Sequence, residues 1–494
     1  MTTVHSDPPP QGYRYLRLAD EMEHQIASGV FKAGEKLPSI RKLHRRTGLS
    51  ITTVYHSFIE LEHRGLVESR LKSGYFVKPR MRPVLPAPKL KRHAAGPRKV
   101  TVGAMARSIV RAMSDPSMLQ LGGTLAAPQL QPLKALHRSM KGIASRDIPG
   151  LLGTYAPPSG STDLRRQIAQ RWLSLIPGLD PGAIVVTGGC LEAVAWCLRA
   201  VAGDGDTIIV ESPTYPWFLQ LIEDLRMFAM EVPTDPSTGI DLQSLQTALK
   251  ENTVAACLLV PNFHNPTGAL MPPEKKAALA DIMAKRRIPL IEDDIHGDLH
   301  FDPLRPAPIK AFDRHGMVLY CTSFSKTVAP GLRLGWVQAG RYTDRVRRLK
   351  LNGTVSSPAI EQHLLASFLK SGAYDRHLRR LRRALRNQAS DLSLAVARHF
   401  PPGTRISAPR GGLTLWVELD ARIDSLAVFE AARQARIAIL PGQICSASSR
   451  FRNFIRLSYG FPWDAPLEKG LQTLGRIIGN QKRTAKPQNV ESKM

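Results

Sequence analysis

The sequence predicts two different folds in one chain. The first is a small α+β domain of three helices and a β-hairpin, and the second is a large α/β domain with a smaller C-terminal α+β lobe. Within the first 78 residues, apolar stripes of helical period precede two short strand-like runs. Further along, helical stretches alternate with short apolar runs, a pattern typical of a mainly parallel sheet. A length of 494 residues suits two or three domains.

The N-terminal elements have clear start and stop signals. Apolar residues recur at helical spacing over 15–27, and Gly29 follows as the expected stop. A second helix is expected to open at Leu37–Ile40 and to end at Gly48, and Ser50 is the expected N-cap of a third helix. Strands are expected at 66–68 and 75–77. These elements make a winged helix-turn-helix, which presents the start of its third helix to double-stranded DNA.

The remaining chain divides by composition. We interpret 1–78 as the winged domain, 79–115 as a basic, proline-rich linker, 116–480 as the large domain and 481–494 as a disordered tail. In the large domain, strands are expected at 183–187, 207–211, 254–260, 289–293, 317–321 and 335–339. A long arginine-rich helical region follows residue 352, and two strand-like runs near 413–419 and 454–459 predict the smaller lobe.

Composition limits the classes of function. The formal net charge is +27, which favours a polyanionic partner and above all nucleic acid. We find no transmembrane run and no signal peptide, so a cytoplasmic protein, associated with the nucleoid when DNA-bound, is expected. The five cysteines are scattered without CxxC spacing, which indicates reduced thiols, with neither a disulfide framework nor a metal site expected.

Polar residues follow the predicted strands of the large domain, where α/β sheets bind their ligands. Gly188-Gly189-Cys190, Ser212-Pro213-Thr214-Tyr215, Asn265-Pro266-Thr267-Gly268, Asp293 and Ser323-Phe324-Ser325-Lys326 each come just after a strand, and Arg333 lies downstream. A lysine between hydroxyls and near an arginine suits a cofactor with an aldehyde and a phosphate. Each motif alone is weak, but their order is not expected by chance.

With this order, residues of about 115–480 resemble the fold-type I pyridoxal-phosphate aminotransferases. The resemblance implies pyridoxal 5'-phosphate (PLP) as the cofactor, bound as an aldimine by Lys326, which also shuttles the proton. It implies that Asp293 pairs with the pyridine nitrogen, that Asn265 hydrogen-bonds the ring O3′ and that Tyr215 stacks on the ring. The implied phosphate ligands are Gly189, Cys190, Ser323, Ser325 and Arg333.

The resemblance also assigns residues outside this set. Arg456 matches an arginine that binds an amino acid α-carboxylate. Tyr155 matches a tyrosine that reaches the phosphate of the partner subunit, which implies a homodimer. His296 stands where relatives usually have a tyrosine at O3′, and it is expected to donate a hydrogen bond and to titrate near neutral pH. Cys190 replaces a hydroxyl residue, and its backbone N–H is expected to compensate for the weaker thiol donor.

The N-terminal motifs, from Leu37-Pro38-Ser39-Ile40-Arg41 to Gly74-Tyr75-Phe76-Val77, resemble the GntR-type winged helix. Together with the linker and the large domain, they resemble the MocR subfamily of GntR regulators over nearly the whole chain. The resemblance implies that Arg41 contacts a phosphate and that Arg70 lies near the wing. The expected exposed side of the recognition helix comprises Ser50, Thr52, Thr53, Tyr55 and His56. Ile51 stands where relatives often have an arginine that reads a base.

Three functions remain open at this stage. The first is a transcription regulator in which PLP and an amino acid or amine effector alter the DNA-binding heads of a dimer. The second is an aminotransferase, converting an amino acid to a 2-oxo acid, that carries a DNA-binding module. The third is a scaffold without a cofactor, which the intact Lys326, Asp293, Asn265 and Arg333 argue against. The N-terminal module favours the regulator, because an enzyme alone has no use for it.

Overall fold

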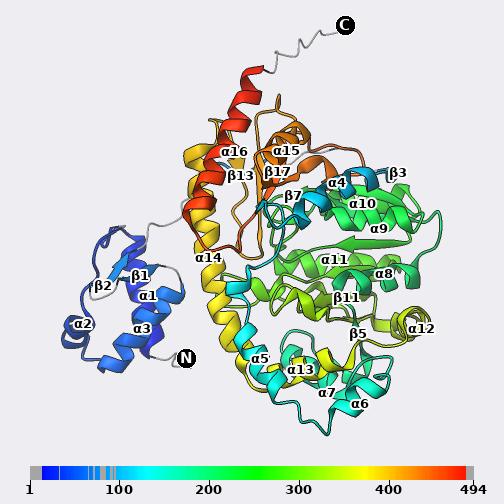
Figure 1. Ribbon diagram of the computed structural model, residues 1–494, viewed down its shortest axis with the longest axis horizontal. Coiled ribbons are helices and arrows are strands. Elements are labelled where there is room, and N and C mark those ends of the chain that lie inside the picture. Colours follow the sequence, from blue (N-terminus) through cyan, green and yellow to red (C-terminus); the bar gives the residue numbers. More distant parts are fainter. Residues whose placement is uncertain are drawn as a thin grey trace, which may run out of the picture. The chain divides into compact units, whose positions relative to one another are not determined.

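The computed structural model of the chain describes residues 14–32, 34–64, 66–70, 73–77, 85–89, 93 and 96–484 (Figure 1). The chain forms two compact units, of which the N-terminal one ends at Arg82 and the larger one begins at Pro83. The first is a three-helix domain with a hairpin and the second a mixed sheet with helices and a smaller lobe. The fold class predicted from the sequence is therefore confirmed.

The N-terminal unit has capped helices and a short hairpin. Its elements are α1 (Arg14–Ala27), α2 (Ile40–Thr47), α3 (Ile51–His63), β1 (Val67–Arg70) and β2 (Gly74–Val77), with the two strands antiparallel. Ser39 and Ser50 cap α2 and α3, because the hydroxyl of each accepts the backbone N–H of the residue three positions later. Gly48 ends α2 at a φ of 68°, a left-handed conformation that glycine adopts at little cost.

The apolar stripes of these helices form the core of the unit. The buried apolar residues of α1 and α3 are Leu18, Ala19, Met22, Ile26, Val54, Phe58 and Leu61. The aromatic ring of Tyr75 in β2 stacks on that of Phe58 with a centroid distance of 4.5 Å. The hairpin thus closes one side of the helical core and completes the winged arrangement.

One large sheet organises the second unit. Its strands are β3 (Pro97–Lys99), β5 (Ile184–Thr187), β6 (Thr207–Ser212), β7 (Phe228–Asp235), β8 (Gly239–Ile240), β9 (Ala256–Leu259), β10 (Leu290–Asp293), β11 (Val318–Ser323) and β12 (Gly335–Gln338). The order is β3-β7-β6-β9-β10-β11-β12-β5, with β8 paired to β7. The strands β7, β6, β9, β10 and β11 are parallel to one another, while β12 is antiparallel to both of its neighbours. Strand β8 is antiparallel to β7. All six predicted strands form, and β3, β7 and β8 are additions that the sequence analysis missed.

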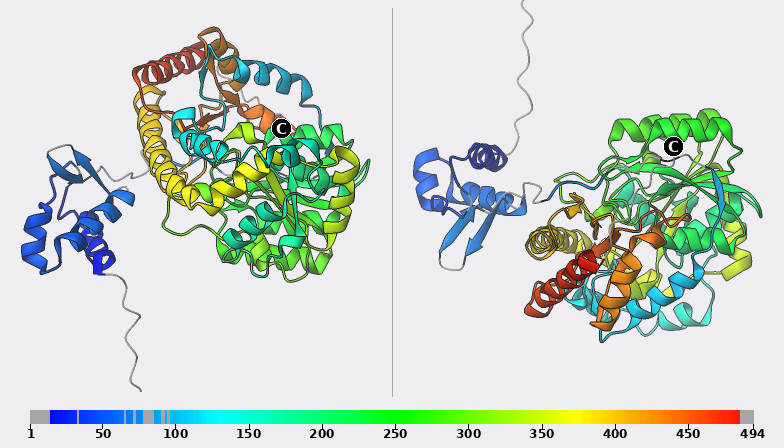
Figure 2. Two further views of the ribbon diagram at one scale, coloured as in Figure 1. Left: turned by 60° about the horizontal axis from the view of Figure 1, so that its bottom comes forward. Right: turned by 90° about the horizontal axis from the view of Figure 1, so that it is seen from above.

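Helices line both faces of this sheet (Figure 2). The helices of the large lobe are α5 (Leu133–Lys141), α6 (Ile148–Gly153), α7 (Thr162–Trp172), α8 (Cys190–Val201), α9 (Pro216–Asp224), α10 (Leu242–Glu251), α11 (Pro273–Arg286), α12 (Thr343–Thr354) and α13 (Ala359–Lys370). Side chains of α7, α10, α11 and α13 pack on one face. Helix α8 packs on the opposite face, where Cys197 and Cys321 place their sulfur atoms 3.6 Å apart.

The smaller lobe is a four-stranded antiparallel sheet with helices. Its sheet has the order β13 (Arg405–Ile406), β14 (Thr414–Glu418), β17 (Phe454–Ser458) and β16 (Leu440–Pro441). A separate short pair joins β4 (Leu119–Gln120) to β15 (Ile437–Ala438). The helices are α4 (Gly103–Ser114), α14 (Ala373–His399), α15 (Ser425–Gln434) and α16 (Ala465–Thr484). Helix α14 is 27 residues long and runs beside α16 (Figure 1).

The predicted linker at 79–115 needs a correction. Strand β3 pairs antiparallel with β7, and α4 buries Ala106, Ile109 and Ala112. This part of the interval is folded because its apolar residues recur at helical spacing and pack against the larger unit. At the other end of the chain, α16 continues to Thr484, so the predicted tail from 481 is wrong for its first four residues. Positions 79–84, 90–92, 94–95 and 485–494 lie outside the described residues.

Residues 86–89, which precede β3, also contact the smaller lobe. The carbonyl of Pro86 accepts the backbone N–H of Ile406 at 3.0 Å, and the carbonyl of Ala87 accepts Arg405 Nε at 2.6 Å. The backbone N–H of Lys89 donates to Glu418 Oε2 at 3.0 Å. Residues 86–89 therefore lie along the edge of the small-lobe sheet.

Candidate functional site

Most residues predicted to bind the cofactor surround one cavity of about 260 Å³ in the large lobe. The cavity lies beyond the carboxyl ends of the parallel strands, where sheets of this kind bind ligands. Its wall contains Thr124, Cys190, Leu191, Tyr215, Trp217, Phe218, Val260, Asn265, Asp293, Ile295, His296, Ser323, Ser325, Lys326 and Arg333. All predicted cofactor residues except Gly189 and Tyr155 belong to this wall.

Lys326 lies in the turn that follows β11 and forms part of the cavity wall. Nζ donates a hydrogen bond to Thr124 Oγ1 at 3.2 Å. Burial, followed by the positive charge of Arg456, lowers the pKa of Lys326 to about 8, although Asp293 acts in the opposite direction. A lowered pKa increases the fraction of neutral amine, which is the form that attacks an aldehyde.

Asp293 ends β10 and is a buried part of the cavity wall. Its Oδ1 accepts from Cys190 Sγ at 3.1 Å and from the backbone N–H of Ile295 at 3.0 Å. Burial raises the pKa of Asp293 to about 6, against the stabilising effect of these two hydrogen bonds. The carboxyl is thus ionised at neutral pH in an environment that favours a protonated nitrogen as its partner.

The thiol of Cys190 therefore donates its hydrogen bond to the carboxylate of Asp293 in this structure. Burial, with the nearby Asp293 carboxylate, raises the pKa of Cys190 well above its usual range, so the thiol keeps its proton. The sequence analysis predicted Cys190 as a phosphate ligand. That role stays a prediction for its backbone N–H, which lies at the first residue of α8.

The predicted phosphate ligands lie at the start of α8 and in the Lys326 turn. Arg333 Nη2 donates to the carbonyl of Gly188 at 2.9 Å, and Nη1 donates to Ser325 Oγ at 3.4 Å. Gly189 has a φ of 114°, and a Cβ added there would lie 2.7 Å from Arg333 Nη2. The backbone of Ser325 donates to Ser323 Oγ at 3.3 Å. Only glycine at 189 allows the guanidinium to approach the start of the helix this closely.

His296 differs from its predicted behaviour. Burial, and then the charge of Lys326, lower its pKa to about 3, so the ring stays neutral at physiological pH instead of titrating near neutrality. Nδ1 lies 3.2 Å from the carbonyl oxygen of Phe263, which accepts only, so the ring proton belongs on Nδ1. Nε2 is buried and has no hydrogen-bond partner among the described residues. Nε2 thus presents an acceptor, not the expected donor.

Arg456 lies behind the cavity wall and is engaged with protein acceptors. Nη1 donates to Asn265 Oδ1 at 2.8 Å, and Nη2 donates to the carbonyl of Gly122. Burial lowers its pKa from the usual arginine value. Its predicted role with an effector carboxylate stays a prediction, as does the role of Tyr155, whose side chain is 83% exposed and is not part of the wall.

The predicted DNA-contacting residues lie on the exposed side of the N-terminal unit. Arg41, Thr52, Tyr55 and His56 are exposed, as is Ile51, which is 52% accessible. The Ser50 and Thr53 hydroxyls lie 2.8 Å apart and take part in the cap of α3. Their contribution to a DNA contact would require this pair to open or to share its hydrogen bonds.

Two arginines of this unit have structural partners. Arg70 pairs with Glu68 at 2.8 Å and lies 4.2 Å above the ring of Phe76, so its predicted DNA role competes with these contacts. Arg64 binds Asp20, Glu23 and Glu60 at 2.5, 2.7 and 3.0 Å. The pairs with Asp20 and Glu23 connect α1 to the end of α3. Sequence reasoning missed the Arg64 cluster, because its partners on α1 are more than 40 positions away.

Comparison with known proteins finds two family matches in this chain. The aminotransferase class I and II family matches residues 127–463, and the family of bacterial regulatory proteins named gntR matches residues 14–77. The HTH-type transcriptional regulator YdcR of Escherichia coli is 36% identical over 94% of this chain and 99% of its own length. YjiR of the same organism, also named an HTH-type transcriptional regulator, is 33% identical over 94% of this chain and 98% of its own length.

The chain belongs to the MocR subfamily of GntR regulators. Its larger unit has the fold of the solved aminotransferases. LysN, the α-aminoadipate aminotransferase of Thermus thermophilus, matches 77% of this MocR chain and 95% of its own length, with a TM-score of 0.71 and 27% identity. That structure holds N-(5'-phosphopyridoxyl)-L-leucine. GntR-type regulators bind DNA, and aminotransferases of this family depend on PLP.

The residues of this MocR chain fit such a cofactor. The cavity offers an amine at Lys326, a buried carboxylate at Asp293 and an unpaired acceptor at His296. Gly189 keeps open the space that a side chain would fill beside Arg333. Among the described residues, no helix is long and apolar enough to span a membrane.

Proposed function

We propose that this MocR protein is a PLP-dependent transcription regulator that binds operator DNA and senses an amino acid or amine. Lys326 would bind the cofactor aldehyde covalently, and Asp293 would hold the pyridine nitrogen in its protonated form. Arg333, Ser323, Ser325 and the start of α8 would bind the phosphate. When bound, PLP supplies an electron sink for bonds at the amine carbon of the effector.

The observation that carries this proposal is a buried amine and a buried carboxylate in the wall of one cavity. Lys326 has its pKa lowered to about 8 and Asp293 has its pKa raised to about 6, both mainly because of burial. Burying two ionisable groups is costly unless a ligand uses them. The attached winged domain then favours regulation as the use of that ligand.

Two parts of the proposal rest on family resemblance. A homodimer would bring the exposed Tyr155 of one subunit to the phosphate of the other, and the two winged domains would then read paired half-sites of the operator. An intracellular protein is also expected, because the proposed partner is DNA. Sedimentation of the purified protein with and without PLP tests the dimer.

A second candidate function is an active aminotransferase with a DNA-binding module. Lys326 and Asp293 are as suitable for turnover as for sensing, and Arg456 is positioned beside Asn265. The neutral acceptor at His296 argues for altered chemistry, because a tyrosine at this position would donate a hydrogen bond. Half-transamination, in which the cofactor keeps the amino group, is compatible with both candidates.

The test is a visible absorbance spectrum of the purified protein with PLP, followed by additions of amino acids and amines. The regulator predicts a cofactor band that shifts on adding an effector, together with altered binding to operator DNA. Continuous release of a 2-oxo acid would favour the enzyme. Lys326→Ala should abolish the covalent band while the protein stays folded, and an unchanged band in this variant would refute the assignment of Lys326.

A further inference from the structure

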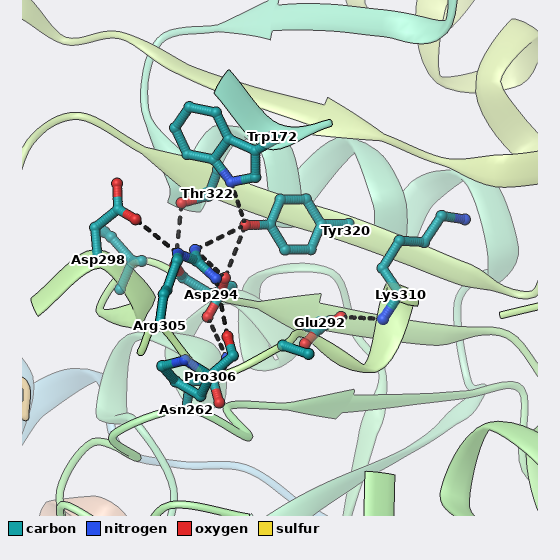
Figure 3. Close-up of polar contacts among 12 residues, drawn as sticks. Trp172, Asn262, Glu292, Asp294, Asp298, Arg305, Pro306, Lys310, Tyr320 and Thr322 are labelled. Atoms are coloured by element: carbon teal, nitrogen blue, oxygen red, sulfur yellow. Dashed lines mark hydrogen bonds and ion pairs between the residues drawn. The ribbon is translucent and has the colours of Figure 1, made fainter. Parts of the chain in front are cut away.

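A buried polar network joins Asp294, Arg305, Asp298 and Tyr320 (Figure 3). Hydrogen bonds to Asp298 connect this network to α14. Asp294, the neighbour of Asp293, accepts from Arg305 Nη2 and from the Tyr320 hydroxyl, both at 2.7 Å. Arg305 Nε donates to Asp298 Oδ1 at 2.6 Å. Asp298 therefore connects the buried ion pair of Arg305 and Asp294 to the next structural element, α14.

The next element is α14, which reaches the Lys326 turn through Asp298 and Thr327. The Tyr374 hydroxyl lies 2.8 Å from Asp298 Oδ2 and 3.0 Å from Thr327 Oγ1. Arg305, Arg171 and Arg382 hold the pKa of Asp298 well below its usual range, so this carboxylate accepts the single phenol proton. The hydroxyl of Thr327 then donates to Tyr374, because no other proton is available for that contact.

A second contact from α14 fixes the backbone of the same turn. His377 Nε2 donates to the carbonyl oxygen of Thr327 at 2.8 Å. His377 and Tyr374 lie on the buried side of the helix, and the aromatic ring of Phe324 packs edge-on against that of Tyr374 at 6.0 Å. The side-chain hydroxyl and the backbone carbonyl of Thr327, the residue next to Lys326, are thus held by one turn of α14.

Helix α14 extends from this turn to the small lobe. With 27 residues it is about 40 Å long, and its later turns pack on α16. Arg382 Nε donates to the backbone carbonyl of Asp298 at 2.6 Å, which adds a third attachment one turn after His377. A displacement of the Lys326 turn would therefore act on a helix shared by both lobes.

We propose that Tyr374 and His377 are positioning residues that hold the Lys326 turn through Thr327 and couple the cofactor site to α14. Neither residue touches the cavity itself. The proposal deepens the proposed function, because it identifies the contact through which the state of Lys326 reaches the small lobe. Only the expected effect on PLP rests on the proposed function, because the contacts that position the Lys326 turn are present in the cofactor-free protein.

The first experiment measures Lys326 in the protein without PLP. Acetylation of Lys326 by acetic anhydride, followed by mass spectrometry across pH, gives the pKa of its amine. Tyr374→Phe and Thr327→Val each remove one hydroxyl of the same contact with little change in volume. We expect each variant to change the rate of Lys326 labelling at fixed pH by about fivefold, the effect of one lost hydrogen bond, or to shift the pH midpoint of labelling by the equivalent amount. The double variant should match Tyr374→Phe, because that single variant already removes the contact with Thr327 together with the one to Asp298.

Tyr320→Phe is the matched control. It also removes a buried tyrosine hydroxyl from the network, but that hydroxyl contacts Asp294 and not the Lys326 turn. We expect it to lower the thermal unfolding temperature without moving the Lys326 midpoint. His377→Gln keeps a side-chain N–H for the Thr327 carbonyl and should restore most of what His377→Leu loses.

The second experiment measures PLP affinity and the pH dependence of its visible band in the same variants. Weaker binding by about fivefold in Tyr374→Phe and Thr327→Val, but not in Tyr320→Phe, supports the proposal. Wild-type labelling and spectra in both variants, or equal changes in the control, would overturn it. If the wild-type protein forms no covalent PLP adduct, the proposed function fails, and the acetylation series still decides the role of Tyr374 and His377.

Discussion

Replacing Gly189 by alanine should disrupt the phosphate end of the cavity. Gly189 has a φ of 114°, and its added Cβ would lie 2.7 Å from Nη2 of Arg333, closer than real Cβ atoms approach a neighbour. The guanidinium must then move from the start of α8 and lose its hydrogen bond to the Gly188 carbonyl. A guanidinium displaced in this way would also lose its proposed contact with the phosphate. The loss of one hydrogen bond to a charged group costs about 1.5–3 kcal/mol, which corresponds to roughly 10- to 150-fold weaker PLP binding.

The assay for this change is PLP titration followed by absorbance, with thermal unfolding of the cofactor-free protein beside it. Gly189 has a φ of 114° and a ψ of 174°, a conformation that is almost exclusive to glycine. Alanine there costs about 1–3 kcal/mol in stability, so both quantities should fall. Gly331→Ala is the control, because nothing lies within 4 Å of a Cβ added there and its backbone is not left-handed. PLP affinity in Gly189→Ala within about twofold of wild type would refute the argument, since that is well below the loss of one charged hydrogen bond.

Three further changes test other parts of the molecule. Arg41→Ala should weaken DNA binding for all sequences and lower the salt slope by about one unit, which is checked by binding measured over a salt series. Asp293→Asn should stabilise the cofactor-free protein by up to about 3 kcal/mol at pH 7 and much less at pH 4. The raised pKa of about 6 means that the folded protein loses stability as pH rises from 4 through 6, and thermal unfolding at both pH values measures the difference. Arg64→Ala should destabilise the N-terminal unit by about 2 kcal/mol in a proteolysis assay, whereas the exposed pair at Arg70 should contribute less than about 0.5 kcal/mol.

Local patterns predicted most of the fold. The six predicted strands and the helices of the winged domain form because their periodicity and caps act over a few neighbouring residues. Strand β7 was missed although it is buried in the sheet, and it contains Pro233, a residue disfavoured in strands. The helical spacing of Ala106, Ile109 and Ala112 was visible within the predicted linker, but the neighbouring proline-rich run outweighed it.

Distant contacts account for what the sequence analysis missed in the site. Motif order placed Lys326, Asp293 and Asn265 around one cavity, yet their roles stay predictions. The thiol of Cys190 reaches Asp293 across 103 positions of the chain, and no local pattern indicates such a contact. The neutral state of His296 depends on burial by several elements, so its ordinary pKa was a poor guide.

The five buried cysteines can serve as native probes of local opening in this protein. All of them are buried in the described part of the chain, and burial raises the pKa of Cys257 and Cys445 to about 12. A thiol reagent therefore reacts only when a segment opens, and the rate of reaction measures the free energy of that opening. Cys190 lies in the cavity wall and Cys445 in the smaller lobe. Their labelling rates, resolved by mass spectrometry, would follow cofactor occupancy and lobe movement without any introduced probe.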